Sequence, residues 1–218
     1  MIRTLALALV VGLAATACTK KEADVDFKPA AITPFFEDAV LGQANAPVTV
    51  IEYASTTCIH CFDFHKTVFP QLKSKYIDTG KVKMIYRVMP TAPAEISIAG
   101  AAIARCAGPD KYFDTIGDLF DTQEALMNAA QAGKGVIDLL VQVGERHGLT
   151  RDQVGTCIGD PAIRTHLENG VREAPAFVDS TPTLIVDGVE VEDHSIDSLS
   201  AAIDAKLAAP APAPSPAP

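Results

Sequence analysis

Residues 48–61 read VTVIEYASTTCIHC, and this stretch decides the fold. The part from Val48 to Ala54 is β-branched and apolar apart from Glu52, a composition typical of a strand that is buried on both faces. The hydroxyl residues 55–57 can cap a helix that begins near Cys58. We therefore expect a buried strand that leads directly into a helix, with a C-x-x-C pair at the start of that helix.

A second strand is expected after this helix. Apolar residues continue at helical spacing from Phe62 to Leu72, where Pro70 is expected to kink the helix, and residues 78–80 close it. Residues 81–88 then alternate between polar and apolar side chains, which predicts a strand. Strand, helix and strand in this order make a βαβ unit, with the C-x-x-C pair at the start of its helix.

A long helical segment separates this unit from the last strands. Apolar residues recur at helical spacing within about residues 94–175, for example from Ile96 to Ala107. Strand character returns at Thr183–Val186, and Asp187-Gly188 predicts a hairpin turn into a final edge strand. A helix over about residues 196–207 follows. This order predicts an α/β protein with one mixed sheet of about four strands and an all-helical insertion between the second and third core strands.

The N-terminus predicts export. A short positive region precedes an apolar run from Leu5 to Ala14, and small residues follow before Cys18. Residues 1–17 are therefore expected to be a signal peptide, because the apolar run is too short for a comfortable transmembrane helix. Residues 15–18 resemble a bacterial lipobox, in which the cysteine is lipidated, although Ala15 stands where that motif usually has leucine. Plain cleavage at the same point and a retained membrane anchor are the alternatives.

The charge balance excludes one class of partner. The chain of 218 residues has 18 Lys and Arg against 27 Asp and Glu, for a formal net charge of -9. This balance argues against binding nucleic acid or an anionic membrane through a basic face. Residues 18–44 are expected to form a lipid-anchor tether and lead-in. Residues 208–218 alternate Ala and Pro and are expected to be a disordered tail.

The chain has 5 cysteines, an odd number that needs explaining in an exported protein. Cys58 and Cys61 form the C-x-x-C pair, and lipidation would use Cys18. Cys106 and Cys157 remain as the other pair in the body of the chain. A structural disulfide between them suits an oxidising compartment. Two buried free thiols are the alternative.

The C-x-x-C pair is either redox-active or half of a metal site. Zinc needs two further ligands, and only His65, one helical turn past Cys61, is placed to contribute. A helix N-terminus favours redox chemistry, because its unpaired amides stabilise a thiolate, the attacking species. We expect Cys58 to be the nucleophile, Cys61 to resolve mixed disulfides, and the side chain of His60 to donate to the Cys58 sulfur. An exposed His60 without such a role is the alternative.

Residues 50–61 closely resemble the active-site strand and helix of DsbA-like thioredoxin-fold oxidoreductases. These proteins carry a C-P-H-C motif and an acid six residues before its first cysteine, where Glu52 falls. Ile59 stands where the motif has proline, so the resemblance does not fix the reduction potential. After a helical insertion the family has a cis-proline that faces the cysteines, and Thr181-Pro182 matches it. The resemblance implies that Glu52 relays protons and that Thr181-Pro182 binds the substrate backbone.

The resemblance implies a thioredoxin-like domain over residues 45–207 that needs no cofactor beyond its redox-active disulfide and no metal. The leading hypothesis is an oxidase that donates the Cys58–Cys61 disulfide to exported proteins with reduced cysteines. A membrane partner resembling DsbB would recharge it. A disulfide isomerase or reductase kept reduced comes second, and a lipoprotein that binds Cu(I) through the same cysteines comes third. We expect a monomer in the periplasm or another extracytoplasmic space, anchored to a membrane by a lipid on Cys18.

Overall fold

The computed structural model describes residues 26–209. The predicted signal peptide 1–17 and the lipidation site Cys18 lie outside the described residues, as do residues 210–218 of the predicted tail. Within residues 26–209, the elements in chain order are β1 (Val40–Leu41), β2 (Val48–Ala54), α1 (Ile59–Thr67), α2 (Phe69–Leu72), η1 (Lys73–Ile77), β3 (Val82–Val88), α3 (Ala94–Ala107), η2 (Pro109–Lys111), α4 (Tyr112–Asp121), α5 (Gln123–Ala132), α6 (Val136–Arg146), α7 (Arg151–Ile158), α8 (Pro161–Arg172), β4 (Thr183–Val186), β5 (Val189–Glu190) and α9 (Ile196–Ala208).

The predicted thioredoxin fold, with an all-helical insertion between the second and third core strands, is confirmed. The sheet has five strands in the order β1-β3-β2-β4-β5. Strands β2 and β3 are parallel, whereas the other neighbouring pairs are antiparallel. The hairpin turn lies where it was expected, with φ of 44° at Asp187 and 81° at Gly188, since both central residues of such a turn need a positive φ.

The sequence prediction of about four strands missed β1. This strand has only two residues, which is too short for alternation to be recognised. It pairs Val40 with Ile85 and Leu41 with Met84 at the edge of the sheet. The last strand also differs from the prediction, because β5 comprises only Val189 and Glu190.

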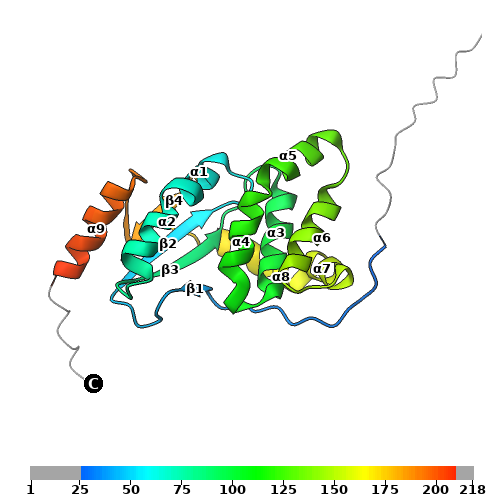
Figure 1. Ribbon diagram of the computed structural model, residues 1–218, viewed down its shortest axis with the longest axis horizontal. Coiled ribbons are helices and arrows are strands. Elements are labelled where there is room, and N and C mark those ends of the chain that lie inside the picture. Colours follow the sequence, from blue (N-terminus) through cyan, green and yellow to red (C-terminus); the bar gives the residue numbers. More distant parts are fainter. Residues whose placement is uncertain (1–25, 210–218) are drawn as a thin grey trace, which may run out of the picture.

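One face of the sheet is covered by the segment α1–η1 and by α9, which lies beside α2 (Figure 1). Successive side chains of a strand point to opposite faces, so Val48 and Val50 of β2 share this face with Val82 and Met84 of β3. All four are buried with apolar residues of these helices. The helix after the C-x-x-C pair ends at Thr67, shortly before the proline that was expected to kink it, and the chain continues as α2.

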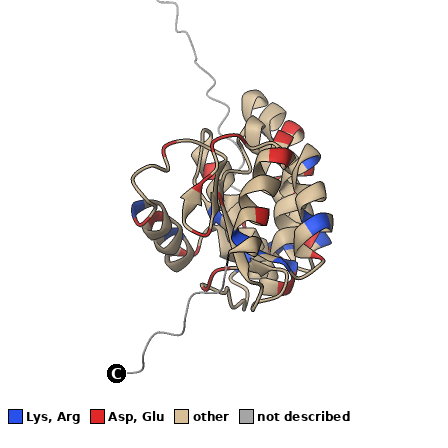
Figure 2. Ribbon diagram, turned by 90° about the vertical axis from the view of Figure 1, so that its left-hand side faces the viewer, with Lys and Arg blue, Asp and Glu red and all other residues tan. Residues whose placement is uncertain are grey.

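The inserted helices α3–α8 form a block beside the end of the sheet at which β2 and β3 stop (Figure 1). Helix α3 runs through this block and is buried along most of its length. A disulfide between Cys106 of α3 and Cys157 of α7 joins two helices of the block, with their Cα atoms 6.3 Å apart. Figure 2 shows basic and acidic residues interspersed along the ribbon of residues 26–209. No helix within this part of the chain is both long and apolar enough to cross a bilayer.

The lead-in before β1 packs along the insertion. The backbone amide of Ala30 donates to the Thr156 hydroxyl of α7 at 3.1 Å. Farther along, the Arg105 guanidinium of α3 donates to the carbonyl of Phe35 at 3.0 Å. From Ala30 to Phe35, therefore, this segment packs against the helical block.

Loss of the disulfide should destabilise the fold. Replacing Cys106 and Cys157 by alanine, in protein that also carries Cys58→Ser and Cys61→Ser, should lower the free energy of unfolding by about 4 kcal/mol. The reason is that the bridge joins residues separated by 51 positions and restricts the unfolded chain. Urea unfolding without reductant measures the change.

The parent carrying only the two serine substitutions, unfolded in the presence of a strong reductant, should lose the same free energy. Equal unfolding midpoints for the parent and the alanine variant, both without reductant, would contradict the prediction.

Candidate active site

The two cysteines of the C-x-x-C pair occupy the first turn of α1. Cys58 is the N-cap residue, and its sulfur accepts a hydrogen bond from the Cys61 backbone amide at 3.3 Å. Both residues are free thiols. Cys58 is 9% exposed and Cys61 is fully buried, so only the first sulfur reaches the protein surface. This is the arrangement that an attacking and a resolving cysteine require.

The hydroxyl residues expected to cap α1 do something else. The Ser55 hydroxyl accepts a hydrogen bond from the Thr91 backbone amide at 3.1 Å and donates to Ser97 at 2.9 Å. The Thr57 hydroxyl donates to the Thr91 carbonyl at 2.9 Å. These bonds tie the turn after β2 to the segment that enters α3, and they leave the cap position to Cys58.

A glutamine of the insertion fastens the same turn. The side-chain amide of Gln123, which is buried, donates to the carbonyls of Thr56 and Cys58 at 2.9 and 3.0 Å. Gln123 was not predicted from the sequence, because nothing local marks a glutamine 65 positions away as a partner of Cys58. The insertion therefore takes part in shaping the active-site turn.

The two sulfurs are driven to opposite protonation states. The pKa of Cys58 is lowered to about 5, chiefly because the Cys61 thiol donates to its sulfur. The Thr181 side chain and the backbone amides of Cys61 and His60 add to this, and burial opposes it. The pKa of Cys61 is raised far above its ordinary value by its bond to Cys58 and by burial. Near neutral pH Cys58 is therefore a thiolate, while Cys61 keeps its proton.

His60 does not act as the sequence analysis expected. Its side chain is exposed and makes no hydrogen bond to any of the described residues 26–209. The contribution of His60 to the lowered pKa of Cys58 comes from its backbone amide. The geometry of a helix N-terminus explains the difference, since amides point toward the cap residue whatever the side chain is.

Thr181 and Pro182 lie directly opposite the reactive sulfur. Their peptide bond is cis, and the Cys58 sulfur lies 3.4 Å from the Thr181 carbonyl oxygen. Pro182 is buried, and β4 begins at the next residue. A groove of about 530 Å³ lies beside them, and His60, Thr181, Pro182 and His194 are among the residues that line it. Cysteine sulfur, cis peptide and groove are thus brought together by α1 and β4.

A buried acid–histidine pair lies beneath the cysteines. Glu52 of β2 is completely buried, and its Oε2 lies 3.1 Å from Nε2 of His65 in α1. The imidazole is stacked between Phe120 and Phe69, with ring centroids 4.2 and 4.8 Å away. The other carboxylate oxygen, Oε1, has no hydrogen-bond partner among the described residues. The charge of Glu52 adds to the factors that raise the pKa of Cys61, which places this carboxylate within electrostatic reach of the buried sulfur.

His65 is thus a partner of Glu52, whereas the sequence analysis considered it only as a metal ligand. Its spacing of four residues from Cys61 places the two on the same face of α1, which is the signal that could have indicated a role for it beneath the cysteines. In the part of the chain that the structure describes, no group of three or more His, Cys, Asp or Glu side chains is arranged to hold a metal ion.

Comparison with known proteins gives consistent matches. The family model described as Thioredoxin matches residues 36–205. A Rickettsia bellii protein provisionally named a protein-disulfide oxidoreductase is 35% identical over 170 residues, which is 77% of this chain and 63% of that protein. The matched region also spans only 60 to 62% of three further Rickettsia relatives.

Solved structures extend the likeness. The crystal structure of Wolbachia pipientis alpha-DsbA1 superposes with a TM-score of 0.70 at 27% identity, covering 79% of this chain and 92% of that one. Oxidised BdbD from Bacillus subtilis gives a TM-score of 0.69 at 21% identity over 83% of this chain and 99% of that one, which shows the shared fold alone.

The thiolate of Cys58 can be titrated directly. In reduced protein carrying Cys18→Ser, the ultraviolet absorbance of the thiolate should rise with a midpoint near pH 5. Cys61→Ala should move this midpoint toward the ordinary thiol value, because it removes the strongest hydrogen bond to the Cys58 sulfur.

His60→Ala is the matched control. It removes the imidazole but keeps the backbone amide, so the midpoint should stay where it is. A shift as large as that of Cys61→Ala would show that the imidazole, and not the amide, stabilises the thiolate.

Proposed function

Because the chain belongs to the DsbA-like thioredoxin-fold family, we propose that it is a protein thiol–disulfide oxidoreductase that donates its Cys58–Cys61 disulfide to exported proteins. The observation that carries this proposal is the Cys58 sulfur at the N-terminus of α1, with a pKa lowered to about 5. A stabilised thiolate favours the reduced form of the pair, which makes the disulfide a stronger oxidant. The same thiolate is a good leaving group in exchange.

The exchange proceeds through a mixed disulfide. A substrate thiolate attacks the Cys58 sulfur, the Cys58–Cys61 bond breaks, and Cys61 leaves as a thiolate that takes up a proton. A second substrate thiolate then attacks the substrate sulfur of the mixed disulfide, and Cys58 leaves as a stable thiolate. The substrate loses two electrons and gains a disulfide, while the Cys58–Cys61 pair gains the two electrons.

The proton for Cys61 is assigned to Glu52. The sulfur is buried, so a proton must come through the protein, and the carboxylate oxygen Oε1 is free to carry one. His65 holds the other oxygen and can share the proton with it, which avoids leaving an isolated charge in the core. Glu52 is thus the relay, and His65 is a positioning residue that acts through it.

Substrate backbone is assigned to Thr181 and Pro182. The backbone of these residues runs beside the Cys58 sulfur, and the adjoining groove gives an extended peptide room to lie along it. Specificity for unfolded chains follows from this arrangement, since backbone contacts do not depend on side-chain identity.

The biological setting that fits this chemistry is extracytoplasmic. Signal-peptide cleavage before Cys18 and lipidation of its thiol would hold the protein on a membrane as a monomer, facing newly exported chains with reduced cysteines. A membrane oxidase resembling DsbB would take electrons from the reduced pair. No cofactor beyond the redox-active disulfide is needed.

The proposal is tested by equilibrium with glutathione and by turnover on a reduced, unfolded substrate. We expect an oxidising potential and net formation of substrate disulfides. Cys58→Ser should abolish turnover, whereas Cys61→Ser should accumulate mixed disulfides with the substrate through Cys58. A potential as low as that of thioredoxin, with no oxidation of substrate, would assign the protein to the reductases instead.

The role of Glu52 is tested on the reverse step, in which Cys61 loses its proton and releases glutathione from a Cys58–glutathione mixed disulfide. Glu52→Gln should slow this release about a hundredfold near neutral pH, since it removes the base. His65→Phe keeps the aromatic stacking and loses the hydrogen bond that holds Glu52, so it should also slow the release, by less than Glu52→Gln does. Acid quenching and chromatography of released glutathione follow the reaction.

The matched control is His65→Gln, which restores a donor to the carboxylate and should recover most of the rate. The double variant Glu52→Gln/His65→Phe should be no slower than Glu52→Gln alone, because the histidine acts through the acid. Additive losses would show that His65 acts independently.

A further inference from the structure

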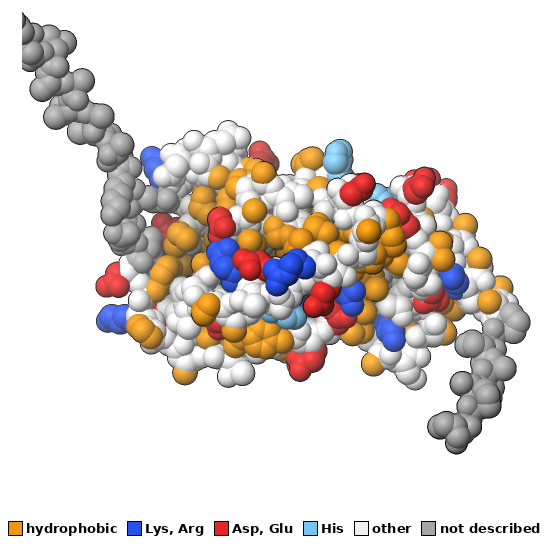
Figure 3. Space-filling view, turned by 180° about the vertical axis from the view of Figure 1, so that it is seen from behind, with side chains coloured by type: hydrophobic (Ala, Val, Ile, Leu, Met, Phe, Trp, Pro, Cys, Tyr) orange, Lys and Arg blue, Asp and Glu red, His pale blue; other side chains and the backbone are white. Residues whose placement is uncertain are grey.

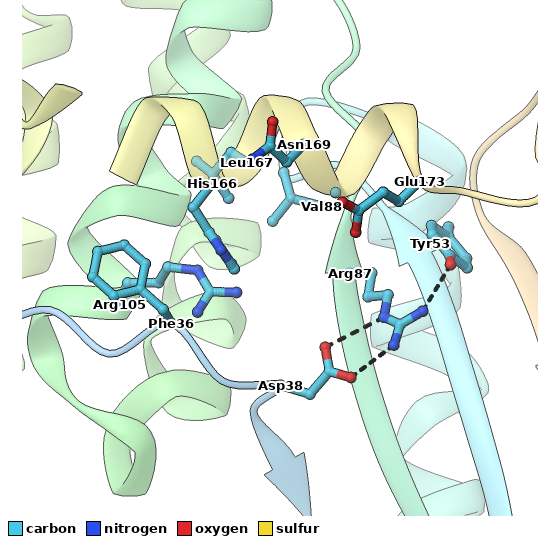
Figure 4. Close-up of a pocket in the computed structure, with 11 residues that line it drawn as sticks. Phe36, Asp38, Tyr53, Arg87, Val88, Arg105, His166, Leu167, Asn169 and Glu173 are labelled. Atoms are coloured by element: carbon cyan, nitrogen blue, oxygen red, sulfur yellow. Dashed lines mark hydrogen bonds and ion pairs between the residues drawn. The ribbon is translucent and has the colours of Figure 1, made fainter. Parts of the chain in front are cut away.

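A second cavity, of about 470 Å³, lies away from the cysteines and shares no residue with the groove beside Pro182. It is bounded by the lead-in before β1, by α3 and α8, and by the ends of β2 and β3 (Figure 4). Tyr53 lines it, and since Tyr53 follows Glu52 in β2, the cavity is on the opposite face of the sheet from the Glu52–His65 pair. None of the residues that line this cavity takes part in the proposed exchange mechanism.

The cavity contains a buried guanidinium that has no carboxylate partner. Arg105 of α3 is only 6% exposed, and it forms no ion pair with any residue between 26 and 209. Its Nη1 donates to the carbonyls of Phe35 and Glu37 at 3.0 and 3.2 Å, and its Nε has no partner. The guanidinium also lies over the rings of Phe35 and Tyr112, at 5.1 and 5.8 Å. A buried charge without a counter-ion is costly, and these contacts leave the positive charge unneutralised.

The other arginine of the cavity is fully occupied. Arg87 binds both carboxylate oxygens of Asp38, at 2.7 and 3.3 Å, and donates to the Tyr53 hydroxyl at 3.0 Å (Figure 4). Asp38 is therefore bonded to Arg87 and forms no ion pair with Arg105. The charges of Asp38 and Glu37 stabilise the Arg105 guanidinium from a distance. The cavity thus combines one satisfied ion pair with one unsatisfied cation.

A further donor lies next to Arg105. The ring of His166 lies next to its guanidinium and edge-on to Phe36, with centroids 5.3 Å apart (Figure 4). Burial and the charge of Arg105 lower the pKa of His166, so near neutral pH the ring is uncharged and carries one N–H donor. Asn169 also borders the cavity, but its side chain is bonded to Arg172 and points away from Arg105 (Figure 4).

The lining limits the charge and shape of an occupant. Glu173 is exposed and forms no ion pair with any of the described residues, so a second negative charge on the occupant would meet repulsion there. Phe36 and Leu167 contribute apolar surface, and Phe36 is 39% exposed. The face of the molecule opposite to that of Figure 1 likewise shows apolar side chains between closely spaced basic and acidic ones (Figure 3).

We propose that this cavity is a binding site for a small organic carboxylate, whose single negative charge pairs with Arg105 and whose apolar body packs on Phe36 and Leu167. His166 supplies an N–H donor to a carboxylate oxygen. The site is independent of the redox function, because none of its residues takes part in the exchange chemistry.

The test uses the full chain in its oxidised form and the matched probes butyrate and butyramide, with inorganic phosphate as a third ligand. Butyrate should shift the Nε–H nuclear magnetic resonance signal of Arg105 saturably and raise the thermal unfolding midpoint with concentration. Butyramide has the same shape without the charge and should do neither, and phosphate should bind more weakly than butyrate. Equal effects of butyrate and butyramide, or no saturable shift, would overturn the proposal.

Variants locate the site. Arg105→Gln should weaken butyrate binding at least tenfold, and Glu173→Gln should strengthen it severalfold by removing repulsion. Arg164→Gln, on the same helix α8 but paired with Glu95 outside the cavity, should leave binding unchanged. Glu173→Gln, on the protein surface, keeps the test open if Arg105→Gln does not fold. The assignment would be contradicted if Arg164→Gln weakened butyrate binding as much as Arg105→Gln. It would also be contradicted if neither Arg105→Gln nor Glu173→Gln changed butyrate binding.

Discussion

The hydrogen bond from the Cys61 thiol to the Cys58 sulfur is the interaction on which the active site depends. It lowers the pKa of Cys58 to about 5 and raises the pKa of Cys61. One contact therefore keeps Cys58 as a thiolate and Cys61 as a protonated thiol near neutral pH. The helix terminus assists, but its contribution is about 0.3–2 kcal/mol. A hydrogen bond to a charged group contributes about 1.5–3 kcal/mol, and several converge here. These hydrogen-bond donors, more than the helix dipole, therefore lower the pKa of Cys58.

This hydrogen bond requires a turn of fixed shape between β2 and α1. Contacts from three parts of the fold hold that turn. Strand β2 is buried and ends directly before Ser55. The Ser55 hydroxyl is hydrogen-bonded to Ser97 and to the Thr91 amide, near the start of α3. Gln123 of the insertion holds the carbonyls of Thr56 and Cys58. Strand β4 brings Thr181 against the sulfur. The helical insertion is thus part of the scaffold of the active site as well as a cover for it.

Features that depend on residues close together in the sequence could be predicted from it. Features that depend on contacts between residues distant in the sequence could not. Strand β2 is visible in the sequence because its residues form a continuous β-branched and apolar run, and β3 and the insertion because their apolar side chains recur with a period over many residues. Strand β1 has no such length, and it exists through pairing with β3. Residues 55–57 have the composition of a cap, yet the hydroxyls of Ser55 and Thr57 are bonded to Ser97 and Thr91, which are distant in sequence. Gln123 and the His65–Glu52 contact were missed for the same reason.

Glu52 and Arg105 show two ways in which a fold keeps a buried charge. Glu52 has a titratable neighbour, so the pair can hold or release a proton and stay close to neutral. Among the described residues Arg105 donates only to backbone carbonyls, and it lies beside aromatic rings and the uncharged ring of His166, so no group in contact with it supplies a negative charge. A packed core would be more stable with an apolar side chain at either position. Under the proposed function, the proton that Cys61 must exchange accounts for the first charge, and the proposed carboxylate ligand accounts for the second.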